Sequence, residues 1–223
     1  MRRRLPLLVT AAGAVIVVVV GWALVTHQPD APAAAPRVTV AVSPPTAPTR
    51  TRPPTPTPSP TPTAGEVPVA APQRIEIPAV GIDLEVLPIT PEGGVIDPPT
   101  VGAAYWIEAY GAPGTDAVNT VYMVAHSSLR MAAAFNPLLD VEHQQSVLVA
   151  GDDVRVTTSA GVLRYAVTGS TRYVKGELPQ AADVWAIDPG VLQLITCFQE
   201  DGLARAQDNL VVTARLVEGY PAG

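Results

Sequence analysis

One cysteine in this chain has the position expected of a nucleophile. Cys197 is the single cysteine, so no disulfide can form within the chain. It lies near the end of the apolar run VLQLITCF, just before the polar residues QEDG. The end of a strand is where a side chain can leave the core and enter a cleft, and a thiol placed there can attack an acyl carbon. The alternative for a free cysteine is a buried and inert side chain.

His126 is the histidine best placed to work with such a thiol. His27 lies in a proline-rich stretch, and His143 lies in the polar segment DVEHQQS, which is typical of a solvated turn. His126 instead closes the apolar run TVYMVA, at a second predicted strand end. An imidazole can donate and accept the protons that acyl transfer moves, and an arginine downstream, Arg205 or Arg215, could bind the developing oxyanion. The residues predict this chemistry if the fold joins two positions 71 residues apart.

Alternating apolar and polar residues indicate that β-strands carry these groups. The segment PQRIEIPAVGIDLEVLPI predicts two strands and a turn, and DDVRVTTSAGVLRYAVTGSTRYV predicts a hairpin with its turn at Ala160 and Gly161. VLQLITCF and DNLVVTARLVE predict two more strands, and only SSLRMAAAFNPLLD has the composition of a short helix. The sequence therefore predicts an all-β fold, a closed or nearly closed barrel of seven or eight strands with one or two short helices.

Composition divides the chain into three parts. Residues 1–26 hold three arginines followed by a 22-residue stretch without formal charge. At about 1.5 Å per residue that stretch is about 33 Å long, enough to cross a hydrocarbon core of about 30 Å. We expect a transmembrane anchor with a cytoplasmic N-terminus, which places the rest of the chain outside the cell. A signal peptide cleaved near residues 31–35 is the alternative.

Residues 27–72 form the second part, and residues 73–223 the third. Fourteen prolines between residues 29 and 72 predict a disordered, extended linker, with a reach of about 130 Å in polyproline geometry. Residues 73–223 contain eight basic and 18 acidic side chains. This negative charge repels a polyanion, which argues against nucleic acid as a partner. Acidic pairs such as Asp152–Asp153 and Glu200–Asp201 are typical of solvated turns, so we assign no metal.

The order of several motifs resembles one known family. LITC at 194–197, followed by a loop, an arginine and DNLVVTARL at 208–216, resembles the C-terminal signature of sortases, the membrane-anchored cysteine transpeptidases of Gram-positive bacteria. IEIPAVGID, VYMVAHSS, AFNPLLD and GDDVRVTT resemble further sortase segments in the same order. The resemblance covers nearly all of residues 73–223 and is greatest for the class E and F enzymes of high-GC bacteria.

The resemblance implies a mechanism without a cofactor. Cys197 would be the nucleophile and His126 the general acid and base. The substrates would be secreted proteins with a sorting signal of the Leu-Pro-x-Thr-Gly type, and the acceptor would be an amine of a peptidoglycan precursor or of a pilin. In class F relatives the catalytic arginine directly precedes DN, where this chain has Gln207. Arg205 lies on the same face of a strand as position 207, so the resemblance implies Arg205 in this role, whereas Arg215 lies about 26 Å further along.

Other enzyme classes fit the sequence less well. L,D-transpeptidases are also exported β-rich cysteine enzymes, but their histidine and cysteine lie together in a Ser-His-Gly-Cys motif that this chain lacks. Papain-like peptidases usually place the cysteine first and on a helix. A non-enzymatic alternative stays open, in which a sortase-like barrel has lost efficient catalysis and serves as a wall-associated binding module. Gln207, and Phe198 directly after the cysteine, motivate this alternative.

Overall fold

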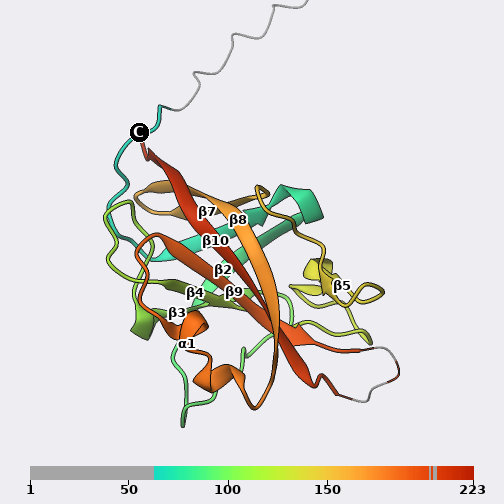
Figure 1. The fold of residues 1–223 in the computed structure, drawn as a ribbon. Coiled ribbons are helices and arrows are strands. Elements are labelled where there is room, and N and C mark those ends of the chain that lie inside the picture. Colours follow the sequence, from blue (N-terminus) through green and yellow to red (C-terminus); the bar gives the residue numbers. More distant parts are fainter. Residues whose placement is uncertain (1–62, 201, 203–204) are drawn as a thin grey trace, which may run out of the picture. The chain divides into compact units, whose positions relative to one another are not determined.

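The computed structural model describes residues 63–200, 202 and 205–223, and these form an all-β domain (Figure 1). Its strands are β1 (Pro72–Ile77), β2 (Ile82–Ile89), β3 (Ala104–Ile107), β4 (Val121–Val124), β5 (Leu139–Asp140), β6 (Gln145–Ser146), β7 (Asp153–Thr158), β8 (Gly161–Val174), β9 (Val191–Phe198) and β10 (Asp208–Pro221). Its helical segments are the 3-10 turns η1 (Pro78–Val80), η2 (Glu108–Tyr110), η3 (Asn136–Leu138) and η4 (Leu178–Gln180), and the single-turn α1 (Ala182–Trp185).

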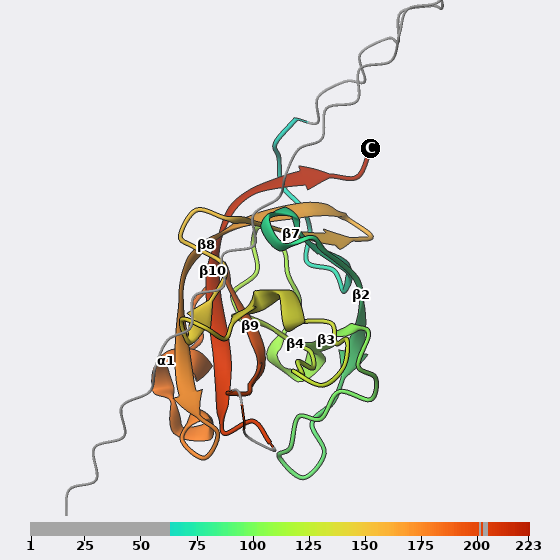
Figure 2. The same cartoon turned by 90° about the vertical axis from the view of Figure 1, so that its right-hand side faces the viewer.

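Eight strands close into a barrel, which confirms the predicted fold class. Their order is β1-β2-β3-β4-β9-β10-β8-β7, and β7 pairs with β1 to complete the circle. Figure 2 shows β8, β10, β9, β4 and β3 side by side in this order. The pairs β2–β3 and β4–β9 are parallel, and the other barrel pairs are antiparallel. Parallel neighbours need long connections, so β4 and β9 bring together distant parts of the sequence.

Two predicted turns are present with small differences. Gly81 follows η1 with a φ of 67°, and its left-handed backbone joins β1 to β2. The β7–β8 hairpin is confirmed, but its turn residues are Ser159 and Ala160, and Gly161 is already the first residue of β8. A Cβ at Gly161 would lie 2.3 Å from the Tyr220 carbonyl oxygen, so only glycine fits this close approach of β8 and β10. The sequence pattern did not predict the four-residue β3.

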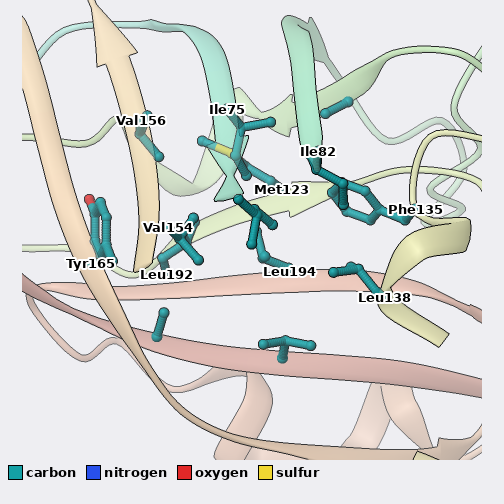
Figure 3. Packing of buried hydrophobic residues seen from close by; sticks show 14 of the residues in the cluster. Ile75, Ile82, Met123, Phe135, Leu138, Val154, Val156, Tyr165, Leu192 and Leu194 are labelled. Carbon is teal, nitrogen blue, oxygen red and sulfur yellow. The ribbon is translucent and has the colours of Figure 1, made fainter. Parts of the chain in front are cut away.

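The strand alternation separates the two faces of the barrel wall. On β9, Leu192 and Leu194 are fully buried in the barrel interior. Ile195 belongs to a second cluster with Val124 and Val211, which is covered by residues of η4 and α1. Figure 3 shows the interior side chains of β1, β4, β7 and β9 pointing toward one another. One face of β9 thus fills the barrel, and the other faces a separate layer outside it.

The predicted helix in SSLRMAAAFNPLLD is wrong, because this segment is an irregular loop followed by the single turn η3 and the two-residue strand β5. The Asn136 side chain explains the loop. Its Oδ1 accepts the Ser128 backbone N–H, and its Nδ2 donates to the Met131 carbonyl at 2.8 Å. These bonds satisfy backbone groups that a helix would otherwise pair, and Pro137 has no N–H to continue one.

The predicted anchor and residues 27–62 of the predicted linker lie outside the described residues. Within the described ranges, no helix has the length and apolar character needed to cross a membrane. Residues 63–71 precede β1 and contact the barrel domain. Val67 in this segment is fully buried, and its backbone N–H donates a hydrogen bond to the Thr115 hydroxyl oxygen at 3.0 Å.

We predict that Leu194→Ala destabilises the domain by about 3 kcal/mol, because it leaves a cavity in the barrel interior that the surrounding strands cannot fill. Denaturant unfolding of the full chain, followed by tryptophan fluorescence, measures this change. Leu129→Ala is the matched control, since Leu129 is 43 % exposed and its truncation should cost less than about 0.5 kcal/mol. Equal losses in the two variants would contradict this assignment of the core.

Candidate active site

The parallel pairing of β4 and β9 brings His126 and Cys197 together. Val124 on β4 pairs with Ile195 on β9. His126 comes two residues after Val124, and Cys197 comes two residues after Ile195, so both side chains continue the same outer face beyond this pair. Both residues are half-buried, and both line one cavity of about 730 Å³.

Hydrogen bonds fix the backbone on both sides of His126 against β9. The Ala125 N–H donates to the Ile195 carbonyl at 3.3 Å, and the Thr196 hydroxyl donates to the Ala125 carbonyl at 2.8 Å. On the other side of the histidine, the Ser127 hydroxyl donates to the Cys197 carbonyl. These contacts extend the β4–β9 pairing past the last strand residue of β4, and they hold the imidazole at the level of the thiol.

The imidazole itself is oriented by a carbonyl group from another segment. Nε2 of His126 lies 2.8 Å from the Pro98 carbonyl oxygen, in the connection between β2 and β3. A carbonyl oxygen can only accept, so Nε2 carries the proton and donates it. In the neutral ring Nδ1 is then the nitrogen that is free to take up a proton.

The cavity next to these two groups has mostly apolar walls. Its floor includes Val124 and Ile195, which belong to the outer hydrophobic cluster. Tyr110, Tyr122 and Trp185 form a group of aromatic rings beside it, and the Tyr122 and Trp185 rings stack with centroids 5.1 Å apart. Further wall residues come from the β2–β3 connection and η4: Pro91, Gly94, Val95, Ile96, Asp97, Pro98, Leu178 and Pro179. An extended peptide with apolar side chains suits such walls.

The structure does not place Arg205 with the other two predicted residues. The Arg205 side chain is exposed and is not among the residues that line the cavity. Gln207 is also exposed and outside the lining, and its Nε2 makes a long contact of 3.5 Å to the Arg205 carbonyl. Arg215 forms an ion pair with Asp188 at 2.6 Å on the protein surface. His126 and Cys197 therefore line the same cavity, whereas the position of a guanidinium beside them stays a prediction.

Arg172 lies near the end of β9 but on the opposite face of the wall. On β8 it pairs with Leu210, a residue of the interior cluster. Its guanidinium lies 4.2 Å from the centre of the Phe198 ring and forms ion pairs with Glu200, at 2.7 Å, and with Asp208. Arg172 thus covers one end of the barrel interior. Phe198 is fully buried beneath it, which gives this residue a packing role.

Two cavity residues were not singled out from the sequence. Asn209 on β10 is the direct cross-strand partner of Cys197, and Lys175 lies just after β8, where its N–H donates to the Gln207 carbonyl at 3.0 Å. Both line the cavity. In an extended chain every second residue lies on the same face, so positions 205, 207 and 209 form one series. The sequence could have indicated Asn209 through this two-residue period. His143 is exposed and bonds Asp140, away from the cavity.

The described residues contain no group of three or more His, Cys, Asp or Glu side chains arranged to hold a metal ion. The acidic residues singled out in the sequence have other contacts where they are described. Asp153 pairs with Arg164 at 2.6 Å, and Glu200 pairs with Arg172. Both carboxylates therefore neutralise arginines of the barrel wall.

Comparison with known proteins gives family and fold. The sequence model of the Sortase domain matches residues 75–217. Sortase A from Corynebacterium diphtheriae is a similar solved structure, with 23% identity, coverage of 68% of this chain and 62% of that chain, and a TM-score of 0.50. Sortase C-1 from Actinomyces oris has 23% identity, coverage of 65% and 70%, and a TM-score of 0.49. Sortase A from Listeria monocytogenes has 17% identity, coverage of 69% and 92%, and a TM-score of 0.49.

No match was found among curated proteins. The structural likenesses at these identities concern the fold alone. The domain match, in contrast, spans more than half of the chain and includes the two residues, His126 and Cys197, that line the cavity together. By this match, the chain belongs to the sortase family.

Proposed function

We propose that this chain is a cysteine transpeptidase that cleaves a Leu-Pro-x-Thr-Gly-like sorting signal between threonine and glycine. The acyl group then passes to an amine of the cell wall or of a pilin. One observation carries the proposal: His126 and Cys197 each follow the paired residues Val124 and Ile195 by two positions, and both line the same cavity. Membership of the sortase family supports this class of reaction.

In the first half of the reaction, the Cys197 thiolate attacks the carbonyl carbon of the threonine. A carbon–sulfur bond forms, and the carbonyl π electrons move to the oxygen. When this tetrahedral intermediate collapses, the carbon–nitrogen bond to glycine breaks and His126 gives a proton to the departing amine. The product is a thioester on Cys197.

The second half reverses these steps with a new amine. His126, now neutral, accepts a proton from the incoming amine as its nitrogen attacks the thioester carbon. The carbon–sulfur bond breaks and the thiolate leaves. One amide bond has been exchanged for another, and the enzyme returns to its starting state without an external oxidant, reductant or cofactor.

The cavity walls support an apolar recognition sequence. Ile195, Val124 and Leu178 present aliphatic side chains next to the reacting pair, and Trp185 adds an aromatic one. Burial of a leucine side chain and a proline ring against such walls is worth about 25 cal/mol for each Å² removed from water. Binding of these two residues would position the threonine carbonyl near Cys197.

Arg205 is the proposed guanidinium for the oxyanion, on the basis of the resemblance and of its place two residues before Gln207. β10 begins at Asp208, so both residues precede the strand on which the sequence had placed them. The exposed position of Arg205 leaves its charge free to approach a bound substrate. The proposal also includes the N-terminal segment as a membrane anchor and, within the predicted linker of residues 27–72, the part before residue 63 as a spacer, since residues 63–72 belong to the barrel domain. With an extracellular domain, the partners would be secreted proteins that carry the sorting signal.

A wall-associated binding module is the second candidate function. The observation that favours it is the place of Arg205 and Gln207 outside the cavity lining. A module of this kind would bind the peptide between the same apolar walls and would leave its amide bond intact. The two candidates differ in chemistry at Cys197, and this makes them experimentally distinguishable.

We predict that Cys197→Ala abolishes cleavage, because no thioester can form without the thiol. We also predict that His126→Ala lowers kcat/KM by about 100-fold or more, because the group that transfers the proton is lost. Cleavage of fluorogenic peptides of the Leu-Pro-x-Thr-Gly type, with x varied and triglycine as acceptor, measures both. His143→Ala is the matched control, since His143 is exposed and outside the cavity, and it should keep wild-type activity. Activity that persists in Cys197→Ala would disprove the mechanism.

Thiol labelling distinguishes the enzyme from the binding module. We expect a peptidyl vinyl sulfone to modify Cys197 of the full chain at neutral pH much faster than it modifies free cysteine. His126→Ala should slow this labelling, because the ring beside the thiol is lost. Labelling no faster than that of free cysteine, with peptide binding intact, would favour the module.

Arg205→Ala tests the proposed guanidinium. Removal of one oxyanion donor is expected to lower kcat by about 100-fold with little change in KM, because the group acts in the transition state. Arg205→Lys should recover part of this loss, since it keeps the positive charge. Wild-type kinetics in Arg205→Ala would identify Arg205 as a solvated surface charge.

A further inference from the structure

Asn209 has the position of an oxyanion donor. It is the cross-strand partner of Cys197 in the antiparallel β9–β10 pair. Directly opposite residues of such a pair have Cβ atoms about 4.5–5.5 Å apart, and their side chains share a face. Both residues are half-buried, and both line the cavity. The Asn209 amide therefore lies within side-chain reach of an acyl group bonded to the Cys197 sulfur.

Three hydroxyl groups on the segments around Cys197 already make hydrogen bonds. The Ser127 hydroxyl donates to the Cys197 carbonyl, and the Thr196 hydroxyl donates to the Ala125 carbonyl. Tyr173, which pairs with Asn209 from the β8 side, donates its hydroxyl to Asp183. Burial and this hydrogen bond raise the pKa of Tyr173 to about 12, so the phenol keeps its proton at neutral pH.

Lys175 offers a charge, but from further away. In the pairing of β8 with β10, Tyr173 lies opposite Asn209, and Val174 lies opposite Asp208. Lys175 follows, at the level of Gln207, and its position is two strands away from β9. Strands are spaced about 4.8 Å apart, so the Asn209 backbone lies one strand spacing closer to β9 than the Lys175 backbone does.

Within the part of the chain that the structure describes, the Asn209 side-chain amide makes no hydrogen bond. Among residues 63–200, 202 and 205–223, no partner accepts a hydrogen bond from its Nδ2 or donates one to its Oδ1. A side-chain amide carries two N–H donors and one carbonyl acceptor. In a cavity with mostly apolar walls, such a group gains most from a bound partner that accepts its hydrogen bonds.

We propose that Asn209 is a catalytic residue that donates an Nδ2–H bond to the oxyanion of the acyl-transfer intermediate. This inference rests on the proposed transpeptidase function and adds a residue to it. When the Cys197 sulfur bonds to the carbonyl carbon, the carbonyl oxygen gains negative charge, and the amide N–H shares that charge without transferring its proton. When the intermediate collapses, the carbonyl re-forms and the hydrogen bond weakens. Asn209 acts from the strand wall, and Arg205 would act as a second donor from the loop side.

The test uses Asn209→Leu in the full chain, a variant of similar size without donors. We expect kcat for cleavage of a Leu-Pro-x-Thr-Gly peptide to fall by about 100-fold while KM changes by less than about threefold. The rate of Cys197 alkylation by iodoacetamide should stay within about twofold of wild type, because alkylation builds no oxyanion. A purely structural role for Asn209 would instead change the alkylation rate and the melting temperature together with kcat.

Two further variants keep the test decisive. Asn209→Asp retains size and polarity but presents only acceptors, so it should lose at least as much activity as Asn209→Leu while staying folded. Gln207→Leu is the matched control, because it removes an amide from the same face of the chain outside the cavity lining, and it should keep wild-type kcat.

Three results would overturn the inference: kcat within threefold of wild type in a folded Asn209→Leu, an equal loss in Gln207→Leu, or full activity in Asn209→Asp. Each of these requires a wild-type chain that cleaves the peptide. A wild-type chain that cleaves no Leu-Pro-x-Thr-Gly peptide, yet binds it, would count against the proposed function itself. The failure of the function and the failure of the Asn209 role are thus separate outcomes.

Discussion

The parallel pairing of β4 with β9 is the constraint on which the site depends. It sets Val124 beside Ile195, and the two chains then continue in step to His126 and Cys197. A shift of one residue in this pairing would turn one of the two side chains to the other face of the wall. The side-chain bonds from Thr196 and Ser127 hold the pairing past the end of β4, where regular strand bonds no longer do so.

The two faces of the wall formed by β9 and β10 have separate tasks. Leu194, Phe198 and Leu210 face the interior and stabilise the barrel by apolar burial. Cys197 and Asn209 face the outer cavity, where polar groups can meet a peptide. Arg172 follows the same division: it lies on β8, pairs with the interior residue Leu210 of β10, and packs on the Phe198 ring at the barrel end. Residues that stabilise the barrel and residues that line the cavity therefore alternate along the same strands, and their side chains occupy opposite faces of the wall.

Much of the fold was predictable because strands repeat every two residues. The alternation in VLQLITCF and DNLVVTARLVE identified β9 and β10 and the faces of their side chains. The helix expected in SSLRMAAAFNPLLD was wrong because amino-acid composition does not show that the Asn136 side chain forms hydrogen bonds with the backbone of Ser128 and Met131 and so stabilises a loop. β3 was missed because four residues are too few to show a period. The burial of Val67 depends on contacts with Thr115, 48 residues later, and has no local signal.

By itself, the sequence determined which residues have the chemistry for acyl transfer and on which strand ends they lie. Cys197 and His126 could be selected because each ends an apolar run, and local alternation is enough to show that. Only the tertiary structure decided which polar groups surround the thiol. The nearness of Asn209, the carbonyl of Pro98 on the imidazole and the place of Arg205 outside the cavity lining all depend on strand order and register. Those are set by the packing of the whole barrel, because pairing between distant strands is chosen by the burial of all their side chains at once.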